Sequence, residues 1–349
     1  MKYFFSFLFL FLLATLFSGC EKEVNLDHLH PAPKLVLNSV CYPDSFVKAH
    51  VSRTWFHTEN HPNVTLPDAD VNLYVNGVFR EKMQFQPELD DLNTVNCYLA
   101  GFRPAPGDHI RITASLPGFQ PVEAETTVPP TDPVREMWVE VKKDTVFENG
   151  FYKIRRYETF HFTLEDDGKQ ENFYQLGCQR GIPQIAFTEE GDTVWFYLWV
   201  NVQPDYKADP VYDTHFTSLD QIFGYGWLAT TYGRAFTNHL FYGKSYTLRL
   251  PAKYPQEIYF DSLSPDENDY YTPIEESLPV RYRLCLYSLS GSYYKYLKTL
   301  QNKSDDTFSN ELVDAGLAEP IRIYSNVRQG RGILGAATGQ NREMQGNQR

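Results

Sequence analysis

What the sequence lacks excludes several classes of protein. Only five cysteines occur in 349 residues, and none stands in the Cys-x-x-Cys or Cys-x-His spacing of structural zinc sites. Lysine and arginine number 32 against 44 aspartates and glutamates, and the net charge of −12 argues against nucleic acid as a partner, because nucleic-acid binding needs clustered positive charge. The sequence contains no Gly-x-Ser-x-Gly elbow and no glycine-rich phosphate loop. It therefore predicts no cofactor, no metal and no set of catalytic residues.

Long apolar runs are also missing, except at the N-terminus. Lys2 precedes a nearly continuous apolar segment, residues 3–17, which is shorter than the ~20 residues of a membrane-spanning helix and typical of a secretory signal. Small residues then precede Cys20, as lipoprotein signal peptidase requires, and the thiol of such a cysteine carries the lipid. We predict that residues 1–19 are a signal peptide and that Cys20 is the lipidation site at the start of a polar tether, residues 20–33. An ordinary cleaved signal followed by a chance cysteine is the alternative.

Four further cysteines, two in each half of the chain, leave their oxidation state open. An exported protein can form disulfides, and the pairs Cys41–Cys97 and Cys178–Cys285 are the simplest oxidised arrangement. The alternative is four small buried hydrophobic residues in strands, because a chain of this length can build a core without covalent links. We favour this second interpretation.

Residues 34–129 show the period-two alternation of strands with one buried face. Leu35 and Leu37, for example, occupy alternate positions of one such segment. Asn76 and Gly77 fit a tight hairpin turn, because both residues tolerate a positive φ. About seven short strands with turn residues between them predict an immunoglobulin-like β-sandwich. The other alternating rows are Val47/Ala49/Val51, Val71/Leu73/Val75, Ile110/Ile112/Ala114/Leu116 and Val122/Ala124/Thr126/Val128.

A second β-rich, sandwich-like domain with one short helix is predicted over residues 134–336, after a proline-rich linker. Ser290 can cap that helix, because apolar residues recur after it at helical spacing. Two long loops, residues 203–244 and 253–279, are of a length that is usually functional or mobile. Residues 337–349 are expected to form a disordered tail. The expected strands are residues 137–141, 157–164, 172–179, 193–202, 245–250 and 280–288.

Short blocks of sequence follow one another in a characteristic order along the chain. They are CEKEVNLD from Cys20, DVNLYVNG from Asp70, PGF from Pro117, AETTVP from Ala124, NFY from Asn172, YGKSY from Tyr242, YYKYL from Tyr293, and NV followed by GRGILG from Asn326. This ordered set resembles the lipoproteins of Bacteroidota that are grouped as domain of unknown function 4249, over nearly the whole mature chain. Residues 203–279 are hard to place against that family.

The resemblance implies a context and no established activity. Such lipoproteins often accompany TonB-dependent outer-membrane transporters. The acidic cluster Glu21-Lys22-Glu23 resembles the signal that sends some of them to the outer face of the outer membrane, with a solvated linker as the alternative.

Candidates for chemistry are few, and each has a simpler interpretation. His57 and His61 flank Glu59, but not in the His-Glu-x-x-His order of a zinc protease. The segment 166–168, Asp-Asp-Gly, fits a hairpin turn better than a calcium site. A hydrolase with paired carboxylates stays open, because its residues need not be neighbours in sequence.

We therefore expect a binding or accessory lipoprotein anchored in the outer membrane and exposed at the cell surface. A TonB-dependent transporter is the expected partner, and the loops 203–244 and 253–279 are the expected contact surface. One alternative is a glycan-binding module that stacks sugars on Trp195, Trp199 and Trp227; a hydrolase is the other.

Overall fold

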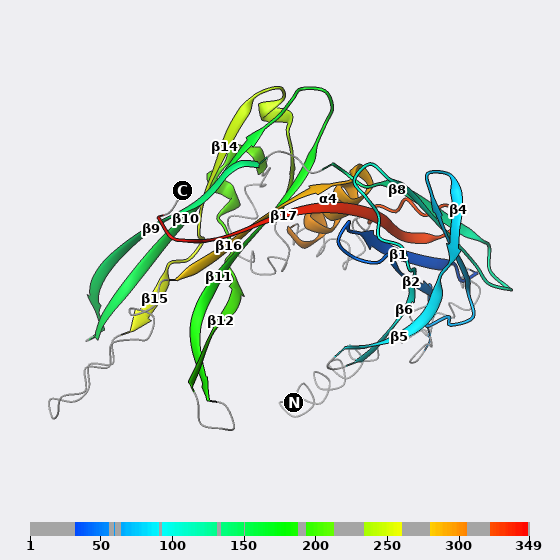
Figure 1. The fold of residues 1–349 in the computed structure, drawn as a ribbon, viewed down its shortest axis with the longest axis horizontal. Helices are drawn as coiled ribbons and strands as arrows, with labels where there is room; N and C mark the ends of the chain where they lie inside the picture. Colours follow the sequence, from blue (N-terminus) through cyan, green and yellow to red (C-terminus); the bar gives the residue numbers. More distant parts are fainter. Residues whose placement is uncertain are drawn as a thin grey trace, which may run out of the picture. The chain divides into compact units, whose positions relative to one another are not determined.

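The structure is a computed structural model that describes residues 32–55, 59, 64–90, 93–130, 134–149, 151–187, 193–212, 234–259, 280–305 and 322–347. The chain divides into a small unit, residues 1–33 and 55–62, and a large unit, residues 34–54 and 63–349. The strands in Figure 1 all belong to the large unit, which is mainly β.

A β-sandwich forms the first part of the large unit. One of its sheets has the strand order β4-β3-β7-β8, and the facing strands β1, β2, β6 and β5 belong to a longer, nine-stranded sheet. Buried residues of both sheets form one apolar cluster, which includes Leu35 and Leu37 from β1 and Ile110 and Ile112 from β7. The strands are β1 Leu35–Cys41, β2 Lys48–Arg53, β3 Asp70–Val75, β4 Val78–Lys82, β5 Gln84–Asp90, β6 Asn93–Leu99, β7 His109–Ser115 and β8 Val122–Thr127.

The local patterns of this part are confirmed. Alternate residues of β1 are buried, with Leu35 and Leu37 fully inside, because successive side chains of a strand point to opposite faces. Asn76 and Gly77 have φ values of 52° and 80°, and they connect β3 to β4 as the expected tight turn.

The second part packs another four-stranded sheet against the rest of the nine-stranded sheet. In that four-stranded sheet β10 pairs with β9 along one edge and with β14 and β15 along the other. The core between the sheets contains Phe160 and Phe162 of β10 with Tyr174 and Leu176 of β11. The strands are β9 Val134–Glu148, β10 Phe151–Glu165, β11 Phe173–Phe187, β12 Thr193–Asn201, β13 Ala235–Thr237, β14 Ser245–Pro251, β15 Gln256–Tyr259, β16 Arg281–Leu289 and β17 Arg331–Gln345.

The expectation of a disordered tail over residues 337–349 needs a correction, because strand β17 extends into this segment. Residues 337–345 form its second half, which pairs antiparallel with β16, while its first half pairs parallel with β1. Residues 333–338 are buried in the middle of the strand, because α4 packs against β17 and β8 also contacts it. Strands from both expected domains are therefore hydrogen-bonded to the same strand (Figure 1).

The expected helix is α4, Gly291–Asp305, the one α-helix in the part of the chain that the structure describes. The Ser290 hydroxyl accepts a hydrogen bond from the backbone N–H of Tyr293 at 3.4 Å, as an N-cap does, and one from Ala336 N–H at 3.0 Å. The cap therefore also fixes the helix to β17.

The four cysteines Cys41, Cys97, Cys178 and Cys285 are buried with free thiols, and neither of the two considered bridges is present. Cys41 and Cys97 lie on β1 and β6, which flank β2, so about two strand spacings of ~4.8 Å separate them, more than a disulfide spans. Cys285 is opposite Gly177 in register, whereas Cys178 is opposite Leu284, so the two thiols point to opposite faces of the sheet.

Burial also disfavours the thiolate form of these cysteines. It raises the pKa of Cys41 to about 12, and it raises the pKa of Cys178 and of Cys285.

Among the described residues, no helix is long and apolar enough to cross a bilayer.

Candidate functional site

Asp166, just after β10, is a buried hydrogen-bond hub. Its carboxylate accepts from the backbone N–H groups of Gly168 (2.9 Å) and Gly243 (2.6 Å), and from the side-chain amides of Asn172 (3.2 Å) and Asn238 (2.6 Å). Burial by itself would raise the pKa of Asp166, but these hydrogen bonds stabilise the charged form and leave the pKa below its ordinary value. The carboxylate therefore has a structural role: its hydrogen bonds join the turn after β10 to the segment that contains Gly243.

The hairpin interpretation of residues 166–168 needs a correction. Gly168 has φ +67°, as a turn requires, but β10 and β11 lie in different sheets, so the turn links two sheets. Two blocks of the sequence, NFY from Asn172 and YGKSY from Tyr242, thereby obtain a physical role, because each supplies a donor to Asp166.

We expect Asp166→Asn to cost roughly 1–3 kcal/mol of folding free energy at neutral pH, because an amide cannot accept from all four donors. The folded-state pKa of Asp166 is lowered, so its contribution is present above the unfolded pKa of about 3.9 and is lost as pH falls through the folded pKa. Urea denaturation of wild type and variant from pH 7 to pH 3 measures this. The difference between them should shrink towards acid; a constant difference would contradict the role of the charge.

A buried ion pair joins the two sheets of the second part. The Arg180 guanidinium on β11 donates two hydrogen bonds of 2.8 Å to the Glu158 carboxylate on β10, and the Tyr282 hydroxyl on β16 donates a third at 2.7 Å. The Glu158 side chain is fully buried. Burial and the charge of Glu158 raise the pKa of Tyr282, so its phenol stays protonated and donates. The sequence showed no signal for this cluster, because its members are 22 and 124 residues apart.

Each of the three buried carboxylates of the described residues accepts hydrogen bonds from several groups of the fold. The third of them, Asp209, accepts from Val211 N–H, from the Tyr246 hydroxyl at 2.8 Å and from Arg249 N–H. Burial and then this carboxylate raise the pKa of Tyr246 to about 12. A glycoside hydrolase needs a carboxylic acid with a raised pKa, held close to a second carboxylate. An open depression of about 330 Å³ has a single carboxylate among its lining residues, which are Val134, Glu136, Met137, Gln340, Asn341 and Arg342.

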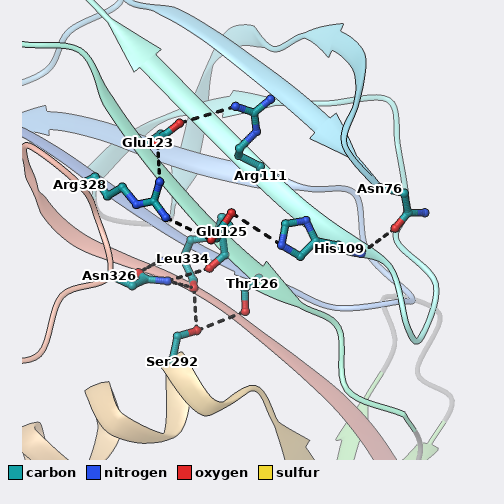
Figure 2. Close-up of polar contacts among 10 residues, drawn as sticks. All are labelled: Asn76, His109, Arg111, Glu123, Glu125, Thr126, Ser292, Asn326, Arg328 and Leu334. Atoms are coloured by element: carbon teal, nitrogen blue, oxygen red, sulfur yellow. Dashed lines mark hydrogen bonds and ion pairs between the residues drawn. The ribbon is translucent and has the colours of Figure 1, made fainter.

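Figure 2 shows a polar network on β7 and β8 of the first sandwich. The Arg328 guanidinium lies 2.9 Å from the Glu123 carboxylate and 3.4 Å from that of Glu125. Arg111 pairs with Glu123 at 3.6 Å, and the His109 ring lies 3.8 Å from Glu125. Arg328 N–H also donates to the Glu123 carbonyl at 2.8 Å, so the segment before β17 covers the outer edge of β8.

The same network continues beneath Arg328 to α4 and β17 (Figure 2). The Asn326 amide donates to the carbonyls of Glu125 (3.0 Å) and Leu334 (2.9 Å) and accepts from Leu334 N–H. The Ser292 hydroxyl donates to the Leu334 carbonyl at 3.0 Å and lies 3.2 Å from the Thr126 hydroxyl. Because the polar groups of this network bond to one another, we interpret its role as structural. The network holds residues 326–334 against β8 and α4.

Seven of the fourteen large apolar side chains that are exposed among the described residues lie on two hairpins, and the first is the β9–β10 hairpin. Phe147 and Tyr152 are opposite each other near its tip, 61% and 55% exposed, with ring centroids 4.8 Å apart. On the other face of the tip, Lys153 forms ion pairs with Glu148 and Glu257. The tip is therefore amphipathic, with a fixed polar face and an apolar face exposed to solvent.

The second is the β11–β12 hairpin, in which the large exposed side chains of β12 are apolar on both faces. Val194, Phe196 and Leu198 lie on one face and Trp195 on the other, each 45–51% exposed. Single exposed apolar residues are ordinary, but contiguous apolar surface marks interaction sites.

Trp195 and Trp199, which the glycan hypothesis needs, lie on one face of β12 with Tyr197 between them. Arg283 stacks on the Trp199 ring at 4.0 Å and Arg281 on the Tyr197 ring at 4.9 Å. The rings of Tyr197 and Trp199 are inclined by 38°, so they are not coplanar.

Several predicted site residues lie outside the described residues. These are Cys20, His57, His61, Trp227, and residues 213–233 and 260–279 of the two long loops. The described parts of those loops contain β13, β15 and the short 3-10 turns Tyr206–Ala208, Pro210–Tyr212 and His239–Phe241.

The described part of the chain is thus a mainly β, sandwich-like protein whose buried polar groups hold the fold together and whose exposed hairpins carry apolar side chains. Residues 21–343 match the family model described as "Domain of unknown function (DUF4249)", and the chain belongs to this family. No curated protein matches the chain.

Proposed function

We propose that the protein is a lipoprotein of the bacterial outer membrane, anchored through Cys20 and displayed at the cell surface, that binds another envelope protein. A TonB-dependent transporter is the partner that we expect. The signal-like N-terminus and the family membership support the setting.

The apolar face of the β9–β10 hairpin tip carries the proposal of a binding role. Phe147 and Tyr152 form a ring pair that is held from behind by the ion pairs of Lys153, so it is presented without further ordering of the backbone. Aromatic side chains are enriched among the residues that dominate protein interfaces. A rigid hairpin that presents two rings to solvent is suited to insertion into an apolar pocket of a partner.

Affinity purification from detergent-solubilised envelopes tests this proposal. Tagged wild-type protein should recover an outer-membrane transporter, and the double variant Phe147→Ser/Tyr152→Ser should recover at least about tenfold less, because losing an aromatic anchor costs ~1.4 kcal/mol or more. Val78→Ser is the matched control, since Val78 is 69% exposed on the different hairpin β3–β4. Equal recovery by the double variant and the control would show that the hairpin is not part of the interface. Recovery of no envelope protein would contradict the proposal.

The anchor has a separate test. We expect Cys20→Ala to abolish acylation and release the protein from the membrane, while the folded body keeps its stability because β1 begins only at Leu35. Palmitate labelling with membrane fractionation measures the first effect, and thermal denaturation measures the second. A variant that remains membrane-bound and still takes up label would show that Cys20 is not the lipid site.

A glycan-binding role is the second candidate, because Trp195, Tyr197 and Trp199 share one face of β12. It predicts signals on a glycan array that Trp195→Ala removes and Val78→Ser does not.

A further inference from the structure

The outer edge of β12 differs in composition from the other edges of the described sheets. Edge strands expose unpaired backbone N–H and C=O groups, and proteins protect them with charged residues, proline, shortness or a covering segment. Among the described residues, strand β12 pairs only with β11; it is nine residues long and contains no charged residue and no proline. Each other described edge strand of more than three residues contains a charged residue or a proline. These residues are Arg80 in β4, Pro87 in β5, Glu123 in β8 (which Arg328 also covers), Arg135 in β9, Arg249 in β14 and Glu257 in β15.

The sequence of β12 is close to a palindrome. It reads Thr-Val-Trp-Phe-Tyr-Leu-Trp-Val-Asn from Thr193 to Asn201, with Tyr197 at its centre. In an antiparallel pair of two such strands, Trp195 is opposite Trp199, Val194 is opposite Val200 and Phe196 is opposite Leu198. Opposite residues share a face of the sheet, so their side chains are in contact. The pairs are therefore tryptophan with tryptophan, valine with valine, and phenylalanine with leucine.

We propose that two copies of this chain associate through β12, antiparallel about a two-fold axis at Tyr197, so that their nine-stranded sheets become continuous. The interface is isologous, because each copy offers the same surface to the other, and it therefore closes at two subunits. Strand β12 itself contains no charged residue, although each chain carries a net charge of −12. Arg281 and Arg283, which stack on the rings of Tyr197 and Trp199, both pair with Glu343. This inference goes beyond the proposed binding of an envelope protein and does not depend on it.

Sedimentation of the full-length lipoprotein in detergent should show a monomer–dimer equilibrium. We expect Phe196→Lys to weaken dimerisation on the order of 100-fold, because each dimer would hold two ammonium groups against apolar side chains. Phe196 is 45% exposed, so the variant should fold with an unchanged Tm. Val78→Lys places the same charge on another exposed apolar position and should leave the dimer intact.

The antiparallel register is tested by rescue and by cross-linking. Adding Leu198→Glu to Phe196→Lys places the new carboxylate opposite the new ammonium group of the second copy, and dimerisation should recover. Under mild oxidation Tyr197→Cys should give a covalent dimer, because opposite Cα atoms of an antiparallel pair lie about 4.5–5.5 Å apart. Thr193→Cys should not, because eight residues at ~3.3 Å each separate its two copies along the strand.

Four results would overturn the proposal: a monomer at every concentration, a dimer that Phe196→Lys leaves unchanged, no rescue by the double variant, or cross-linking at Thr193→Cys equal to that at Tyr197→Cys. Recovery of a transporter in the affinity experiment would be unaffected by any of these results, so the two proposals fail separately.

Discussion

Replacing Glu158 with glutamine is expected to cost roughly 3–5 kcal/mol of folding free energy, because it leaves the Arg180 charge buried without its counter-ion. Glutamine preserves the shape of the site and can still accept from the Tyr282 hydroxyl, so the loss reports the charge rather than a cavity. The pair connects β10 to β11, and hence one sheet to the other, so the variant should weaken the whole second part. Urea denaturation followed by fluorescence and circular dichroism measures the loss.

A matched control lies on the same strand. Glu165 pairs with Arg135 at 3.1 Å, but the side chains are 48% and 68% exposed, so Glu165→Gln should cost less than about 1 kcal/mol. The double variant Glu158→Leu/Arg180→Leu should be more stable than Glu158→Gln, because apolar residues often replace a buried ion pair at little cost. Equal losses for Glu158→Gln and Glu165→Gln would show that burial does not decide the contribution of these pairs.

Gly332→Ala is the second variant with a large expected effect, a loss of about 4 kcal/mol or more, or failure to fold. Gly332 has φ +114°, and a Cβ atom there would overlap the Leu37 carbonyl oxygen and approach the Asn38 side chain at 2.8 Å. The backbones of β1 and β17 approach closely here, since Leu37 is the register partner of Gly332. Thermal denaturation and the yield of soluble protein measure the result.

Gly107→Ala separates the two causes of that loss. Gly107 has a similar φ of +92°, but an added Cβ would meet nothing within 4 Å. Alanine there should cost only the backbone penalty of about 1–2 kcal/mol. If both substitutions cost the same, the close approach of β17 to β1 is not what requires glycine at 332.

Features that depend on neighbouring residues could be predicted from the amino-acid pattern. The alternation of Leu35 and Leu37 predicted a half-buried strand, because side chains of a strand point alternately to its two faces. Asn76-Gly77 predicted a tight turn because both residues adopt positive φ cheaply. Ser290 predicted the start of α4 because a hydroxyl can accept from the first turn. Each of these signals lies within a few residues of the structure that it predicts.

The pairing of strands and the contacts between distant polar side chains became visible only in the folded chain. Residues 337–345 have no alternation and looked like a tail, yet β17 is a central strand whose position depends on β1 and β16, about 300 and 50 residues away. The partners of Glu158 lie 22 and 124 residues away, and two of the four donors to Asp166, Gly243 and Asn238, lie 77 and 72 residues away. The exposed edge of β12 follows from sheet order and not from its composition, which would suit a buried strand. Strand order and register are set by the total burial and hydrogen bonding of the whole chain, which no local pattern records.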